Sequence, residues 1–157
     1  MWSNTDWNRR APSAPEPAAA FAFLSDVRAW GALFPNVERV EPLAGPGGAP
    51  VPDAFVWTMA PMGPPGVAVR TVYGCRYTFD AAAQTVAWTP VDGVGNARFA
   101  GRVALDPRTD GGTDARLVLD AVLSVPAPAL VRPLVSAAVT FEFGRMLETF
   151  AGRLEAV

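Results

Sequence analysis

Histidine and lysine are both absent from the sequence, and all 13 basic residues are arginine. Without an imidazole, the chain can form neither a Ser-His-Asp triad nor a Cys-His pair, and it offers no histidine ligand to a metal ion. Without lysine, it can form no lysine Schiff base and has no P-loop lysine. The commonest routes to nucleophilic and nucleotide-dependent catalysis are therefore closed.

Cysteine is reduced to a single residue, Cys75, so the chain has no internal disulfide and we expect no cysteine zinc site. Cys75 has no basic partner in the sequence pattern and is predicted to be a buried, inert thiol. Without histidine, general acid–base catalysis would depend on Asp, Glu, Tyr or Cys. We assign no catalytic residue and expect neither a metal nor a cofactor.

Excess charge and long apolar runs are also lacking. The net charge is −2, with no basic surplus to steer the protein to nucleic acid or anionic lipid. The longest apolar run, Ala18–Leu24, falls well short of the ~20 residues of a membrane span, so we expect no transmembrane segment. Asp6, Arg9 and Arg10 precede any apolar stretch, unlike a signal peptide. Together with the lone cysteine, this favours a cytoplasmic location.

What the sequence does contain is enough apolar material for one core. Half of the 157 residues are apolar, a length and composition that suit one domain over residues 1–157. Proline and glycine punctuate short segments instead of gathering in one linker.

Helix signals lie near the N-terminus. After a possible first strand at Thr5–Ala11, Ser13–Glu16 has the spacing of a capping box and predicts a short helix through Ser25. Asp26 is placed to cap a second short helix, Val27–Phe34, which ends at a proline.

Strand signals dominate from residue 37 to residue 124. Alternating apolar and polar residues, separated by turn residues, predict strands at about 37–43, 55–59, 70–79, 85–90, 98–105 and 116–124. Turns are expected at Asp92-Gly93, Gly95-Asn96 and Asp110–Gly112. Consecutive strands joined by short turns form an antiparallel meander with one apolar face.

The period changes between Pro126 and Val157, where one helical stripe carries Val135, Val139, Phe143, Met146, Leu147, Phe150, Leu154 and Val157. So long an amphipathic helix must bury its stripe, and the apolar face of the sheet is the only large surface for it. The predicted fold class is α+β, with a curved antiparallel sheet wrapped around the long C-terminal helix and two short helices after the first strand.

Two local patterns, in this order of elements, resemble the START-like superfamily, also called SRPBCC or helix-grip. Ala14–Asp26 looks like the family's A-P-x-x-x-x-(V/A)-F-x-x-L-x-D opening, and Trp30–Pro35 looks like its W-x-x-(L/W)-x-P continuation. The resemblance implies a ligand-binding domain with a cavity between sheet and helix. Relatives bind lipids, quinones, polyketides, steroids or aromatic compounds; some cyclise polyketides and some act as protein partners. The fold alone does not choose among these roles.

The candidate ligand-binding residues are the large or polar side chains predicted to point toward the long helix. They are Trp57, Thr71, Tyr73, Tyr77, Trp88 and Phe99 from the sheet, with Glu142 and Phe143 from the helix. A buried Tyr or Trp usually needs a hydrogen-bond partner, which a ligand or a trapped water would supply. The alternatives are a plain core for the sheet residues and a surface pair with Arg145 for Glu142.

A second apolar face of the long helix predicts an interface. Leu130, Leu134, Ala137 and Phe141 lie opposite the buried stripe. If the helix runs straight from Ala127, these residues form an exposed strip for a second subunit, a membrane surface or a loop at the cavity mouth. Alternatively, Pro133 breaks the helix, and Leu130 and Leu134 pack inward.

Our leading functional hypothesis is non-catalytic binding or transfer of an apolar or aromatic small molecule, of lipid, quinone or polyketide type. The alternatives are a polyketide cyclase-like enzyme, in which Tyr73, Tyr77 and Glu142 polarise a carbonyl, and an interaction module of the chaperone-activator or ribosome-associated type. The arginines on the outer face of the sheet also suit RNA, but Asp120 and the acidic balance favour ordinary cross-strand pairs, and we expect no nucleic-acid partner.

Overall fold

The computed structural model of the protein describes residues 17–110, 113–124 and 128–156. The strand expected at residues 5–11, the capping box at residues 13–16 and Val157 lie outside the described residues.

Two short helices open the described chain, as the sequence predicted. They are α1, Pro17–Leu24, and α2, Val27–Leu33. The Asp26 carboxylate accepts a hydrogen bond of 3.1 Å from the backbone N–H of Ala29, which caps α2 at its N-terminus. A side chain at Gly31 would overlap Val40 of the first strand, so glycine allows α2 to lie close against the sheet.

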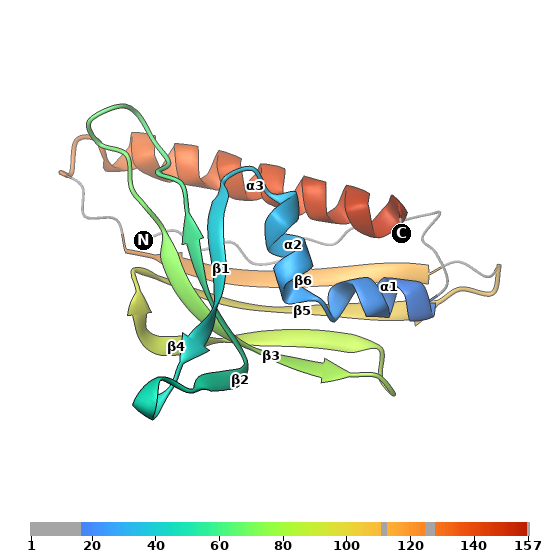
Figure 1. The fold of residues 1–157 in the computed structure, drawn as a ribbon. Coiled ribbons are helices and arrows are strands. Elements are labelled where there is room, and N and C mark those ends of the chain that lie inside the picture. Colours follow the sequence, from blue (N-terminus) through green and yellow to red (C-terminus); the bar gives the residue numbers. More distant parts are fainter. Residues whose placement is uncertain (1–16, 111–112, 125–127, 157) are drawn as a thin grey trace.

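The sheet has six antiparallel strands in sequence order. They are β1, Val37–Ala44; β2, Pro50–Met59; β3, Val72–Asp80; β4, Thr85–Gly95; β5, Ala97–Pro107; and β6, Thr113–Leu123. A single 3-10 turn, Pro46–Gly48, joins β1 to β2. The predicted meander is confirmed, and each strand lies beside its sequence neighbours (Figure 1).

The turn expected at Asp92-Gly93 is wrong, because these residues lie within β4. The register against β3 shifts there, with Tyr73 opposite Gly95 and Cys75 opposite Pro90, so the turn residues form an irregularity inside the strand. Gly95 does precede a reversal of the chain. It has a positive φ of 68°, and a Cβ there would overlap the Val72 carbonyl.

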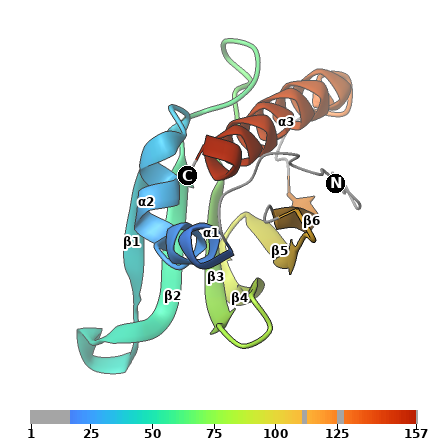
Figure 2. The same ribbon diagram turned by 90° about the vertical axis from the view of Figure 1, so that its right-hand side faces the viewer.

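The long helix α3, Arg132–Ala156, lies across the concave face of the sheet, with α1 and α2 on the same side (Figures 1 and 2). Its predicted stripe faces the sheet, with Met146 half-buried and the other described members buried, namely Val135, Val139, Phe143, Leu147, Phe150 and Leu154. Pro133 lies in the first turn, where its missing N–H has no intrahelical partner to lose, so it starts the helix. No helix in the described ranges is long and apolar enough to cross a membrane.

The opposite face of this C-terminal segment is apolar and exposed. Leu130 is 93% exposed, Leu134 59% and Phe141 64%, and Ala137 is exposed between them. Leu130 and Leu134 therefore do not pack inward as the alternative required. The Arg145 guanidinium lies 5.9 Å from the centre of the Phe141 ring.

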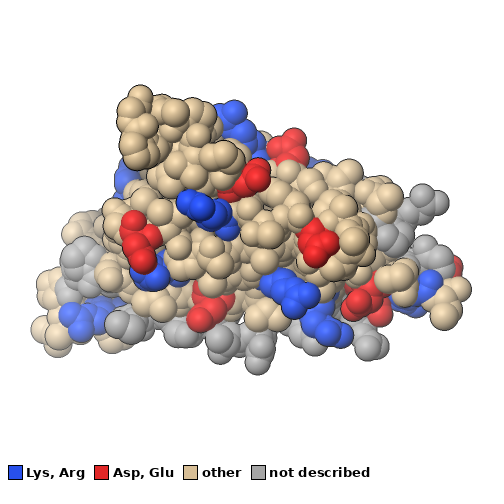
Figure 3. Space-filling model, turned by 90° about the horizontal axis from the view of Figure 1, so that it is seen from below, with Lys and Arg blue, Asp and Glu red and all other residues tan. Residues whose placement is uncertain are grey.

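The outer face of the sheet carries both signs of charge. Arg70 pairs with Glu38, and Arg98 pairs with Asp92. Seen from below, arginines and carboxylates alternate over the described surface, without one continuous basic stripe (Figure 3). This arrangement fits ordinary surface ion pairs.

Candidate ligand-binding cavity

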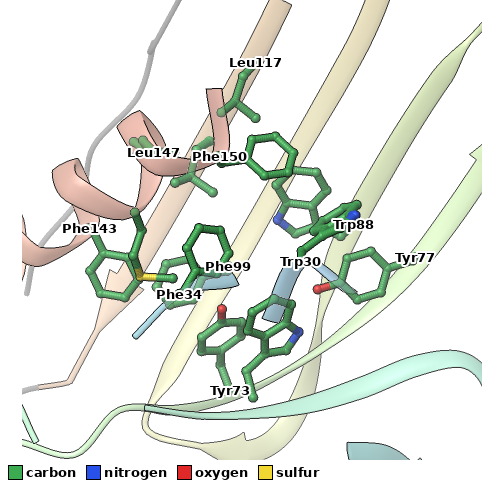
Figure 4. Close-up of a pocket in the computed structure, with 13 residues that line it drawn as sticks. Trp30, Phe34, Tyr73, Tyr77, Trp88, Phe99, Leu117, Phe143, Leu147 and Phe150 are labelled. Atoms are coloured by element: carbon green, nitrogen blue, oxygen red, sulfur yellow. The ribbon is translucent and has the colours of Figure 1, made fainter. Parts of the chain in front are cut away.

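A cavity lies between the concave face of the sheet, α2 and α3 (Figure 4). Its walls are formed by Trp30, Phe34, Trp57, Tyr73, Tyr77, Trp88, Phe99, Leu117, Leu119, Phe143, Met146, Leu147 and Phe150. The free interior is about 80 Å³, whereas one water requires roughly 10–15 Å³. There is room for a small molecule, but this is well below the ~300–1,000 Å³ of pockets for drug-sized ligands.

Cross-strand pairing builds the sheet wall of the cavity. Trp57 on β2 lies opposite Tyr73 on β3, and Tyr77 on β3 lies opposite Trp88 on β4. Trp57 and Tyr73 are stacked, with ring centres 5.8 Å apart and planes 9° apart. Because side chains alternate across a strand, the spacing of Tyr73 and Tyr77 sends both rings to the same face.

Trp30 on α2 joins the two short helices to the cavity wall. Its ring packs edge-on against the rings of Tyr77, Trp88 and Phe150, with ring centres 5.7, 5.9 and 5.3 Å apart respectively. Its indole N–H donates a 3.0 Å hydrogen bond to the Phe23 carbonyl. Trp30 is thus held in place by its own partner, and its ring is fixed against both the sheet and α3.

The long helix supplies the remaining wall. Phe143 reaches down from α3 to Phe99 on β5, with ring centres 4.9 Å apart. Figure 4 shows Leu147 beside Phe143 on the helix and Phe150 near Leu117. The helix side of the cavity wall therefore consists of apolar side chains that also belong to the core.

The interior is uncharged. No lining residue is Asp, Glu or Arg. Burial raises the pKa values of Tyr73 and Tyr77 well above their usual value and raises the pKa of the Cys75 thiol to about 12. The Cys75 thiol donates to the Phe99 carbonyl at 3.4 Å, so it is neither ionised nor free for nucleophilic attack. Among the described residues, no cluster of three or more Cys, Asp or Glu side chains is arranged to hold a metal ion.

The structure brings together most of the predicted ligand-binding residues. Trp57, Tyr73, Tyr77, Trp88, Phe99 and Phe143 all line the cavity. Thr71 is fully buried without lining it, and its Oγ1 has no hydrogen-bond partner. Glu142 also lies outside the lining, 3.4 Å from Arg145, as the surface-pair alternative had it.

Other lining residues were not among the sequence candidates. Trp30 lies on α2 and Phe34 at the C-cap that follows it. The others come from β6 and α3, namely Leu117, Leu119, Met146, Leu147 and Phe150. Their signal in the sequence was the inward apolar phase of each element. That phase marks a buried side chain but does not separate a cavity wall from filled core.

The comparisons with known proteins agree with this geometry. A family model described as polyketide cyclase / dehydrase and lipid transport matches residues 8–157. No curated protein matches the chain.

Solved structures resemble it over nearly their whole length. The Zhui aromatase/cyclase from a Streptomyces strain is 16% identical, with a TM-score of 0.62 and coverage of 98% of this chain and 94% of that one. A START superfamily protein from Mycobacterium smegmatis is 15% identical, with a TM-score of 0.62 and coverage of 98% and 97%. TTHA0849 from Thermus thermophilus is 18% identical, with a TM-score of 0.61 and coverage of 99% and 98%.

At such low identity these likenesses show the fold and do not reveal the ligand. The fold is the START-like helix-grip, and the family match covers almost the entire sequence. The chain therefore belongs to the family of polyketide cyclases, dehydrases and lipid-transport proteins.

Proposed function

We propose that the protein binds a small apolar or aromatic molecule in the cavity and carries it without chemical change. The observation that supports this most directly is the lining, in which nine aromatic side chains and no charged side chain surround a free volume of about 80 Å³. Apolar walls with a few polar groups are typical of small-molecule sites. The limited volume favours a ligand of one or two rings, unless flexible side chains such as Met146 move aside.

Catalysis as in a polyketide cyclase has less support. An acid–base mechanism needs a group that exchanges protons near neutral pH. Burial raises the pKa values of Tyr73 and Tyr77, which keeps both phenols protonated, and Glu142 lies outside the lining. The described part of the cavity wall thus offers neutral hydrogen-bond donors and no carboxylate.

Native mass spectrometry of the purified protein tests the proposal. We expect a fraction of the protein to retain one small organic molecule, which organic extraction should release and identify in unchanged form. Incubation with excess of the extracted compound should restore the same mass increase. If the compound is converted to a product on incubation, the non-catalytic role is wrong; if no compound is retained and none from a panel of small aromatics binds, the binding role is wrong.

A further inference from the structure

Among the described side chains that line the cavity, Trp57 carries the one buried hydrogen-bond donor without a partner. Its indole Nε1 is buried and has no hydrogen-bond partner. Burial deprives the Trp57 indole N–H of its hydrogen bond to water. Because this group can only donate, only an acceptor atom can replace that bond. By contrast, the Trp30 indole already donates to the Phe23 carbonyl.

The Tyr77 hydroxyl lies next to this donor. The Trp57 N–H faces the Tyr77 oxygen without forming a hydrogen bond of normal geometry to it. Burial and the neighbouring Cys75 raise the pKa of Tyr77, and the nearby N–H offsets only part of that rise, so the phenol keeps its proton. Its hydroxyl also lies against the Cys75 sulfur, which is a weak acceptor, so a carbonyl oxygen would be a stronger partner for the Tyr77 proton. Figure 4 shows the Tyr77 hydroxyl directed toward the interior of the ring cluster.

The charge of the cavity limits what this pair can bind. A carboxylate or phosphate placed among the lining residues would meet no arginine. Burying an unpaired charge in such surroundings is strongly unfavourable. A neutral oxygen acceptor has no such cost and matches two donors that converge from neighbouring strands.

We propose that the Trp57 indole N–H and the Tyr77 hydroxyl donate together to one carbonyl oxygen, so that the ligand is a neutral aromatic ketone or a related carbonyl compound. This inference rests on the proposed binding function and adds the chemical class of the ligand. The aromatic walls hold the rings of the ligand, and the two donors set its orientation.

Matched probes separate the proposed binding function from the proposed recognition of a carbonyl group. The probes are 1-tetralone, which carries the carbonyl, tetralin, which has the same skeleton without it, and tetralin-1-carboxylate, which adds a charge. Their dissociation constants are to be measured by NMR titration of the full chain. We expect 1-tetralone to bind roughly three- to tenfold more tightly than tetralin, which corresponds to one net buried hydrogen bond. The carboxylate should bind at least about tenfold more weakly than the ketone.

Two variants remove one donor each and little else. Tyr77→Phe deletes the hydroxyl, and replacing Trp57 by 3-benzothienylalanine exchanges the N–H for sulfur in a ring of similar shape. Each should reduce the ketone-to-hydrocarbon preference toward one while tetralin still binds. Phe150→Leu is the matched control, because Phe150 is a cavity ring on α3 that packs on Phe23 and Trp30 and not on either donor. It should weaken both probes alike and preserve the preference.

The carbonyl stretching band of bound 1-tetralone gives a readout independent of affinity. We expect a lower frequency than in cyclohexane, with a partial return in Tyr77→Phe. Two results would contradict the carbonyl assignment: an unchanged ketone-to-hydrocarbon preference in both donor variants, or a carbonyl band at the cyclohexane position. Either would mean that a trapped water or the two residues themselves satisfy these donors. Binding of tetralin would in that case still uphold the binding function of the cavity. If none of the probes binds, the carbonyl assignment and the proposed function both fail.

Discussion

Gly101 on β5 shapes the cavity by leaving space for a neighbouring ring. It pairs with Trp88 on β4, and a Cβ at Gly101 would overlap the Trp88 indole. The indole therefore lies across β5, where a larger residue would push it away. The close approach of the ring requires glycine here, since the Gly101 backbone lies outside the left-handed region.

Gly101→Ala should therefore lower the free energy of unfolding by about 1–3 kcal/mol, because the rigid indole must move to accept one methyl group. Gly144→Ala on α3 is the control, since a Cβ there meets nothing within 4 Å. That change should raise stability by about 0.5–1 kcal/mol through helix propensity. Urea denaturation measures both, and equal effects of the two substitutions would contradict the packing argument.

Buried phenols and a buried thiol make the protein sensitive to alkali. Burial raises the pKa of the Cys75 thiol from its ordinary value of 9.0 to about 12 in the folded protein, because it disfavours the thiolate. Above pH 9.0 the unfolded chain releases a proton that the folded chain retains, so stability is complete below that pH and falls as the pH rises. Tyr73 and Tyr77, whose pKa values are also raised, add to the loss above their ordinary value of 10.0.

We expect the free energy of unfolding to fall from about pH 9 upward, and more steeply above about pH 10 where the tyrosines add, with each titrating group contributing up to about 1.4 kcal/mol per pH unit. In Cys75→Ala the free energy of unfolding should decline less steeply, because only Tyr73 and Tyr77 remain as titrating buried groups. Denaturant titrations at several pH values check this. A stability that stays level to about pH 11 would show that these groups are not buried as described.

The elements differ in how far the sequence determined them. The stripe that includes Val139, Phe143 and Phe150 predicted which side of α3 meets the sheet, since a helix repeats every 3.6 residues. In β4, Asp92-Gly93 indicated a turn, but the chain continues as a strand through a register shift. Turn residues and bulge residues share a composition, so only the pairing with β3 separates the two.

The interface role of Leu134 and Phe141 on the outer side of α3, and of Leu130 just before it, stays a prediction. Phe141→Arg should leave the free energy of unfolding nearly unchanged, because the ring is 64% exposed. If the strip contacts a second copy or a membrane, the variant should sediment as a smaller species or lose binding to phospholipid vesicles. Thr140→Arg, at an exposed neighbouring position, is the control. A wild-type protein that is monomeric and does not bind vesicles would rule the interface out.

At the scale of the whole molecule, the order of elements predicted the layers, but not the dimensions of the space between them. The alternation in β3 placed Tyr73 and Tyr77 in one wall. The central position of Trp30 was missed, because its contacts join α2, the sheet and α3, and none of these is local in sequence. Glu142 was predicted to line the cavity but instead pairs with Arg145 outside the lining. Its position on the helix did not decide between these two arrangements.

The account as a whole depends on the cavity being the binding site. β6 offers a matched pair of positions to test this, because Leu119 lines the cavity and the adjacent Val118 points outward and is 41% exposed. Leu119→Phe adds volume inside the cavity, and Val118→Phe adds the same ring outside it. Both variants add one aromatic ring to β6, at adjacent positions on opposite faces of the strand.

The most direct measurement is a fluorescence titration of both variants and the wild type with 1-aminonaphthalene, a two-ring dye that is neutral at pH 7 and whose emission shifts to shorter wavelength in apolar surroundings. We predict saturable 1:1 binding to the wild type and to Val118→Phe with similar dissociation constants, and binding about tenfold or more weaker to Leu119→Phe, a difference of at least about 1.4 kcal/mol. Equal binding by all three proteins, or none by the wild type, would contradict a ligand site between the sheet and α3.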